Sequence, residues 1–196
     1  MGNSVAGRPR SRRDRGMPAL IEGFFGFVWF GWGQADASTG LQVWLAVAGV
    51  VAALVALAGG VQAFRNPAST GVMHDRQARR RYGLAVGVEF TLAGVGAAIL
   101  AVAGQSDFIP VWVCAVVGVH FFPLASLLED RLLVALGASV TAVAMVALVA
   151  GLATDVAPST VTGVGAGTLL TGFALAALAG ARPEETPQLS SSDLRA

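Results

Sequence analysis

Six long apolar stretches constrain the fold of this 196-residue chain more than any other feature of its sequence. An α-helix rises 1.5 Å per residue, so about 20 apolar residues cross the ~30 Å hydrocarbon core of a bilayer. The stretches are 17–34, 41–64, 83–104, 109–128, 132–152 and 159–180, and none contains lysine or arginine. We therefore predict an all-α integral membrane bundle of six transmembrane helices, arranged as three antiparallel hairpins.

The composition agrees with a membrane environment. Hydrophobic residues make up 55% of the chain and charged residues 13%, whereas about 25% charged is usual in soluble domains. All thirteen basic residues are arginine, which together with abundant Ala, Val and Gly is typical of a GC-rich bacterial genome. Cys114 is the only cysteine, which excludes an intrachain disulfide, a CxxC redox pair and a thiolate metal cluster.

The connections between the apolar stretches alternate in charge. The links 35–40, 105–108 and 153–158 each carry one aspartate and no arginine, while every arginine lies in the two tails, in the link 65–82 or at Arg131. Arginine is retained on the cytoplasmic side of a membrane. The partition predicts that both termini lie in the cytoplasm and that the protein resides in the bacterial cytoplasmic membrane.

The two tails differ from the rest of the chain. Residues 1–16 and 181–196 combine Pro, Ser, Gly and charge with few large apolar residues, so we predict disordered cytoplasmic tails around a transmembrane domain at 17–180. An alternative is that residues 1–37 form a cleaved signal peptide. Glu22 and two tryptophans within the apolar part favour a retained helix, and both alternatives leave the orientation of the later helices unchanged.

Small residues recur at helical spacing in two places. Gly163, Gly167 and Thr171 are four residues apart, as are Gly83 and Gly87. Such ridges let helix backbones approach closely in membranes, so both are predicted to pack against other helices. A phosphate-binding glycine loop would follow a strand and face water. The glycines at 163–167 lie inside an apolar stretch, so they do not form such a loop.

The link 65–82 holds His74 beside Asp75 and then three consecutive arginines, Arg79, Arg80 and Arg81. Two adjacent ligands rarely reach one metal ion, so no metal or other cofactor is predicted. The sequence has no basic patch interleaved with aromatic residues and no recognised nucleic-acid-binding module. Nucleic acid is therefore not an expected partner. The arginines are predicted to anchor the topology and to contact anionic lipid headgroups of the bilayer.

Four tryptophans lie toward the aspartate-bearing ends of the predicted helices: Trp29, Trp32, Trp44 and Trp112. Indole rings prefer the boundary between headgroups and hydrocarbon. The pattern predicts an aromatic belt.

Three ionisable residues fall inside the apolar stretches: Glu22, Glu89 and His120. A charged side chain at the bilayer centre costs about 2.5 to 3.5 kcal/mol on insertion scales, so such groups usually have a partner or contact water. Glu22 is close enough to the helix start to extend to the cytoplasmic boundary. Glu89 lies roughly 10 Å deep, on a helix face of small residues.

Glu89 and His120 are predicted to meet. The helices that carry them are joined by four residues, and the depths of the two groups differ by only ~5 Å. Such a pair could share one proton and titrate as a unit. Pro123 lacks an N–H and is expected to kink the helix beside His120. The alternative is that His120 is neutral and structural, bonded to a backbone carbonyl or a hydroxyl.

The segment 119–125 reads Val-His-Phe-Phe-Pro-Leu-Ala. It resembles an HFxPLA-type segment of uncharacterised small multi-pass membrane proteins of bacteria, actinobacteria in particular. The resemblance implies a multi-pass membrane fold and draws attention to His120 and Pro123. It implies no activity.

Two functions remain open from the sequence. The first is transport of a small solute or of protons, with a polar intramembrane site at Glu89 and His120. The second is a non-catalytic scaffold or accessory subunit, which would pack through its Gly/Ala ridges against a second copy or another membrane protein. An enzyme is not expected, because no HExxH, GxSxG or DxxxD motif is present and a single intramembrane histidine cannot hold a catalytic metal.

Overall fold

The computed structural model of the chain describes residues 12–65, 76–128 and 130–180, and these residues form helices and short connections without a strand. Nearly all of both predicted tails, and His74 with Asp75, lie outside the described residues. The long helices are α1 (Arg12–Gly33), α2 (Thr39–Arg65), α3 (Arg76–Val102), α4 (Ile109–Leu128), α5 (Arg131–Ala153) and α6 (Pro158–Ala179), with a 3₁₀ turn η2 at Ser106–Phe108. The predicted all-α class is confirmed.

Five of the helices, α2 to α6, are long and apolar enough to cross a membrane. This makes the chain a membrane protein by the length and composition of its helices. α1 does not belong to that group, because Pro18, Glu22 and several glycines reduce its hydropathy. The sequence analysis predicted six transmembrane helices and left a cleaved N-terminal segment as an alternative for the first, and α1 is the helix that does not qualify as a span.

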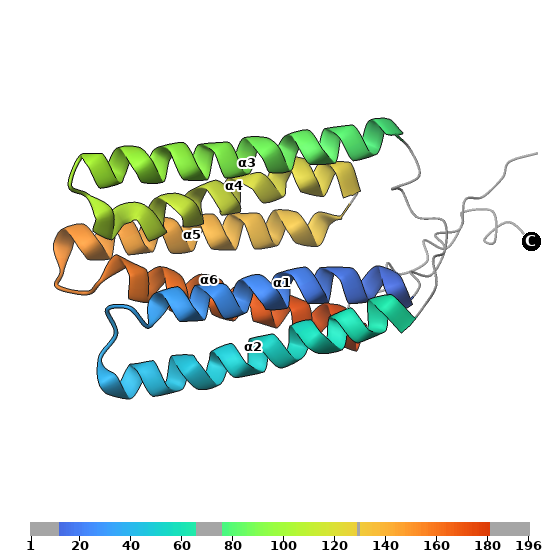
Figure 1. Cartoon of the computed structure of the whole chain (residues 1–196), viewed down its shortest axis with the longest axis horizontal. Helices are drawn as coiled ribbons and strands as arrows, with labels where there is room; N and C mark the ends of the chain where they lie inside the picture. Colours follow the sequence, from blue (N-terminus) through green and yellow to red (C-terminus); the bar gives the residue numbers. More distant parts are fainter. Residues whose placement is uncertain (1–11, 66–75, 129, 181–196) are drawn as a thin grey trace, which may run out of the picture.

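The two helices of each predicted hairpin are in contact, and the six helices also gather into two groups of three (Figure 1). In one group α4 lies between α3 and α5, and in the other α1 packs against both α2 and α6. The contact between α5 and α6 joins the groups. α1 therefore has two extensive helix neighbours, whereas α3 packs mainly on α4.

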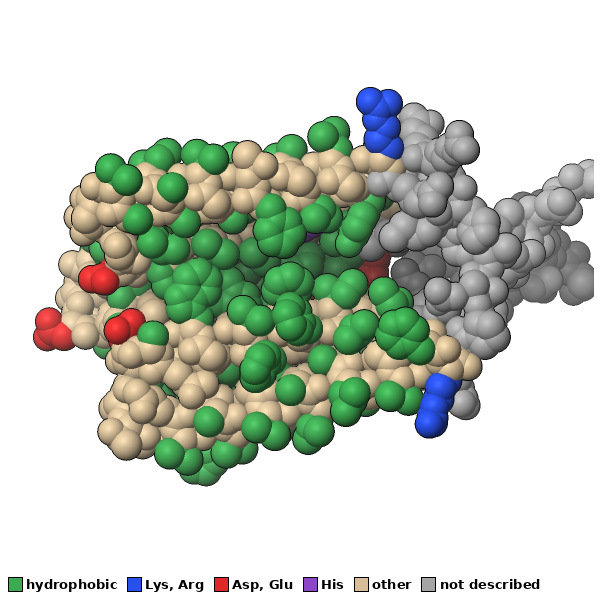
Figure 2. Space-filling view, viewed as in Figure 1, with side chains coloured by type: hydrophobic (Ala, Val, Ile, Leu, Met, Phe, Trp, Pro, Cys, Tyr) green, Lys and Arg blue, Asp and Glu red, His purple; other side chains and the backbone are tan. Residues whose placement is uncertain are grey.

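Exposed acidic and basic side chains lie mainly at opposite ends of the bundle (Figure 2). The α1–α2 loop, η2 and the α5–α6 loop lie at one end and carry Asp36, Asp107 and Asp155. The exposed Arg65 and Arg80 lie at the opposite end. We call these the aspartate end and the arginine end. Between them, hydrophobic side chains cover the surface, as expected for contact with lipid.

Two helices begin more than two residues earlier than predicted, both at the arginine end. α1 begins at Arg12 rather than at residue 17, and α3 begins at Arg76 rather than at residue 83. Arg and Gln have high helix propensity. A helix can also continue beyond the hydrocarbon core into the headgroup region, where charge is tolerated. Residues 12–16 are therefore helical, and the prediction that they belong to a disordered tail was wrong.

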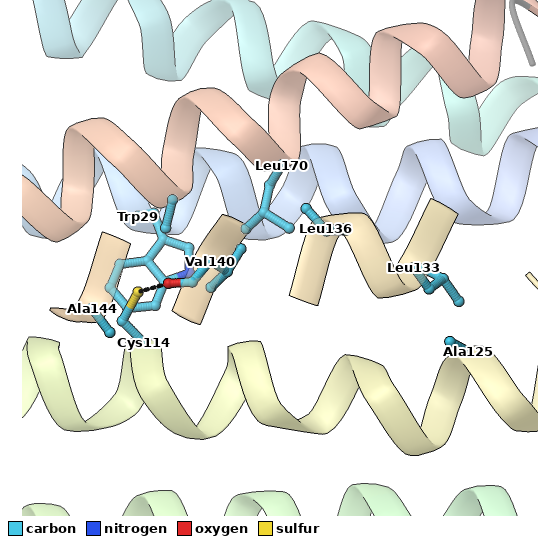
Figure 3. Close-up of a cluster of buried hydrophobic side chains, with 9 residues drawn as sticks. Trp29, Cys114, Ala125, Leu133, Leu136, Val140, Ala144 and Leu170 are labelled. Carbon is cyan, nitrogen blue, oxygen red and sulfur yellow. Dashed lines mark hydrogen bonds between the residues drawn. The ribbon is translucent and has the colours of Figure 1, made fainter. Parts of the chain in front are cut away.

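A buried cluster joins α1, α4, α5 and α6 at the centre of the bundle (Figure 3). Trp29 is 3% exposed there, and the Sγ–H of Cys114 donates to the carbonyl oxygen of Val140 at 3.5 Å. Trp32 stacks on Trp29 with the ring centroids 5.3 Å apart. The prediction that Trp29 belongs to an aromatic belt was wrong, because α1 turns this face toward the core. Trp44, which is 72% exposed, does face the surroundings.

Candidate intramembrane site

The link between α3 and α4 places the candidate site. Gly104 has a φ of 72°, in the left-handed region that favours glycine. Its N–H donates to the carbonyl of Ala101, and the N–H of Gln105 donates to that of Leu100 at 2.8 Å. These bonds end α3 in a tight turn, and the chain returns through η2 into α4. The short link therefore holds α4 directly against α3.

Small residues allow α3 and α4 to approach each other. Ala85, Ala93 and Gly96 are partly buried on the face of α3 that also bears Glu89. A side chain at Gly96 would collide with the indole of Trp112, and the Nε1–H of Trp112 donates to the carbonyl of Leu92 at 3.0 Å. Among the described side chains, this bond is one of two polar links between the helices.

The second polar link is the candidate site itself. The Nε2 atom of His120 lies 3.4 Å from the Oε2 atom of Glu89. The side chains are 10% and 16% exposed respectively, so both are largely enclosed between the helices. At this distance a small side-chain rotation completes a hydrogen bond between imidazole and carboxylate. The structure thus brings together the two residues that the sequence singled out.

The pair can exchange a proton within the apolar part of the bundle. A carboxylate and an imidazole are both proton acceptors near neutral pH, and each would be costly in hydrocarbon without a partner. A single proton shared between them gives each group a hydrogen-bond partner. No cluster of three or more His, Cys, Asp or Glu that could hold a metal ion occurs among the described residues.

The other face of α4 is fixed to α5 by a contact that the sequence analysis missed. A side chain at Gly118 would come within 2.7 Å of the backbone nitrogen of Thr141, and one at Gly137 within 2.8 Å of the carbonyl oxygen of Gly118. Thr141 donates to the carbonyl of Gly137 at 2.8 Å. The four-residue spacing of Gly137 and Thr141 was a usable signal. This contact anchors the helix that carries His120.

α4 continues through Pro123, which lies inside the helix, so the proline does not end it. Pro123 cannot donate to the carbonyl of Val119, one residue before His120. The aromatic ring of Phe121 lies beside the imidazole, with the ring centroids 6.4 Å apart.

Glu22 is not at the helix boundary, and the prediction that its side chain extends there was wrong. It is 7% exposed and belongs to the α1–α2–α6 group rather than to the α3–α4 contact. Close helix packing explains its burial: a side chain at Gly23 would come within 2.8 Å of the backbone of Ala56, and one at Gly59 within 2.5 Å of that of Leu20. The helices around Glu22 are too near each other to leave it exposed.

The α6 ridge of Gly163, Gly167 and Thr171 packs on α1. A side chain at Gly163 would collide with the backbone of Gly33, and one at Gly167 would come within 2.7 Å of the ring of Phe30. Thr171 is 7% exposed, and its hydroxyl lies against the α1 backbone at Gly26.

The α3 ridge behaves differently. Gly83 and Gly87 are exposed, and a side chain added at either would meet nothing within 4 Å. Among the described residues no helix packs against them, because α3 turns its opposite face to α4, and a packing role for this ridge stays a prediction. Near the start of the same helix Arg80 is exposed, while the side chains of Arg79 and Arg81 lie outside the described residues.

No protein-family model, curated protein or solved structure matches this chain. The assignment of the candidate site therefore rests on the geometry described above.

Proposed function

We propose that this chain is a small multi-pass protein of the bacterial cytoplasmic membrane that moves a small solute or protons, with Glu89 and His120 as its proton-binding pair. The observation that supports the proposal is the 3.4 Å contact between the two side chains within an apolar helix interface. Ionisable residues inside transmembrane segments often mark proton or substrate paths. The proposal includes no enzymatic step.

The attachment of α3 suggests how the pair could reach both sides of the membrane. No residue in the apolar span of α3 is buried, whereas about a third of the α5 span is (33%). α3 is joined to the bundle mainly through α4, which is itself fixed to α5. A shift of α3 along α4 would open the pair alternately toward the two ends, which is the movement that alternating access requires.

The test of transport is a proton-flux assay. Purified full-length chain is reconstituted into liposomes that contain a pH-sensitive dye, and a pH gradient is imposed together with a potassium diffusion potential. We expect faster dye response than in protein-free liposomes, with a further increase when the coupled solute is added from a panel of small amines, acids and sugars. A response equal to that of protein-free liposomes under all conditions contradicts proton-linked transport.

We further propose that the aspartate end faces the periplasm and that both termini are cytoplasmic, on the basis of the arginine partition. In a Cys114→Ala background, Asp107→Cys is expected to react with a membrane-impermeant maleimide added to intact cells. Ser191→Cys is expected to react only after the cells are permeabilised. The reverse labelling pattern would show that the bundle is inserted the other way round.

A second candidate function is a membrane scaffold or accessory subunit, and the exposed α3 ridge favours it. Gly83 and Gly87 gain nothing from lipid contact, whereas a partner helix could pack closely against them. Gly87→Leu should then abolish co-purification of a partner membrane protein, while Gly172→Leu, an exposed glycine of α6, should leave it intact. Identical co-purification from both variants would remove the support for this function.

A further inference from the structure

An open apolar groove runs between α5 and α6 on the outer surface of the bundle. Its volume is about 810 Å³, within the size range of small-molecule sites. Ser139, Ala142 and Val146 line it from α5, and Thr160, Gly165 and Thr168 line it from α6.

The two helices are closest at the floor of the groove. A side chain at Gly165 would come within 2.6 Å of a methyl group of Val143. The absence of that side chain allows the close approach, and the flanking side chains form the walls.

The length of the groove identifies the kind of occupant. Its lining on α6 extends from Thr160 to Leu169, which corresponds to roughly 14 Å of helix. It begins two residues after the start of α6, at the aspartate end. A depth of roughly 14 Å is about half of the ~30 Å hydrocarbon core, the depth of one leaflet. One acyl chain of a lipid in that leaflet matches this length.

The charge at the aspartate end, where the α6 side of the groove begins, favours one class of headgroup. The α5–α6 loop, which joins the two walls at this end, carries the exposed Asp155. Asp36 and Asp107 lie at the same end, and none of the described arginines does. This negative charge favours a headgroup with an ammonium group and opposes an anionic one.

We propose that the α5–α6 groove binds one acyl chain of an ethanolamine phospholipid, with the ammonium of the headgroup near Asp155. The site is independent of the proposed transport function, because it lies on α5 and α6 and not between α3 and α4. Its apolar walls supply affinity through van der Waals packing against the acyl chain, and Asp155 supplies the preference for the headgroup.

The test is native mass spectrometry of the detergent-solubilised full chain, titrated with phosphatidylethanolamine or with phosphatidylglycerol of the same acyl composition. We expect one tightly bound phosphatidylethanolamine per chain, and weaker binding of phosphatidylglycerol. Ala142→Trp fills the groove from an exposed position and should weaken phosphatidylethanolamine binding by about tenfold or more. Ala98→Trp, at an exposed position of α3, is the matched control and should bind like the wild type.

A loop substitution tests the headgroup separately from the groove. Asp155→Asn removes a charge without altering a packed residue, and it should reduce the preference for phosphatidylethanolamine over phosphatidylglycerol while the melting temperature stays unchanged. The proposal is overturned if the wild type binds both lipids equally, or if the two tryptophan variants bind alike. It is also overturned if Ala142→Trp converts a dimer into a monomer, since the groove would then be an interface between copies.

Discussion

Replacing Gly163 with leucine is expected to prevent α6 from closing against α1. Even the first carbon of a new side chain would collide with the backbone of Gly33 and lie 2.8 Å from the carbonyl oxygen of Trp29. Backbone atoms cannot move aside as a flexible side chain can, so the helices must separate. Overpacking of a buried site costs about 1 to 3 kcal/mol and occasionally more, and we expect a loss of about 3 kcal/mol or more here.

The matched control for this variant is Gly172→Leu. Gly172 lies on the same helix, and a side chain there would meet nothing within 4 Å. Both substitutions add the same apolar volume and change helix propensity alike, so they differ only in what the new side chain contacts. Unfolding in mixed micelles, followed by circular dichroism, measures both. Equal stability of the two variants would mean that α1 and α6 do not pack as described.

Replacing Glu89 with glutamine is expected to reduce proton flux in liposomes by roughly tenfold or more, the order of effect of removing a positioned proton-transfer group. The amide is nearly isosteric with the carboxyl group and can still bond to His120, so packing between α3 and α4 should be preserved. It cannot bind and release a proton at physiological pH. His120→Gln should have a comparable effect, and the double variant should be no slower than either single variant because the two groups act as one unit.

Thr91→Val serves as the control for this experiment. Thr91 is a polar residue of the same helix, exposed away from α4, and its hydroxyl donates to the carbonyl of Gly87 at 2.8 Å. Its replacement should leave flux unchanged. If Glu89→Gln and His120→Gln transport at the wild-type rate, the pair is a structural link between α3 and α4 and the proposed proton-binding role is excluded.

The helical class and the candidate pair could be predicted from sequence because both depend on local information. The apolar stretches are long enough to cross a bilayer. Because the link between α3 and α4 has only four residues, these two helices must be neighbours. Helical rise then gives the two side chains similar depths, but only the structure shows that they face each other.

The burial of Trp29 and Glu22 could not be predicted in the same way. The burial of Trp29 depends on α6 packing against α1, and these helices are more than a hundred residues apart in the chain. The burial of Glu22 depends on how closely α1 packs against its neighbours, which hydropathy does not reveal. The ridge of Gly83 and Gly87 differs in the opposite direction: the sequence predicted a packed face, and the structure leaves it exposed. The spacing of small residues shows that a close contact is possible, but not whether a neighbouring helix lies on that side.

The position of α1 has a consequence for how the protein is made. α1 is the least apolar of the six helices, and it packs extensively against both α2 and α6. A ribosome synthesises α1 before any of its partners and α6 only after the five other helices. Until α6 is inserted, Glu22 and the glycine-lined face of α1 have only α2 to cover them. Assembly of the bundle therefore waits for α6, and a chain interrupted before that helix would present a polar, poorly covered α1 to the proteases that remove incomplete membrane proteins.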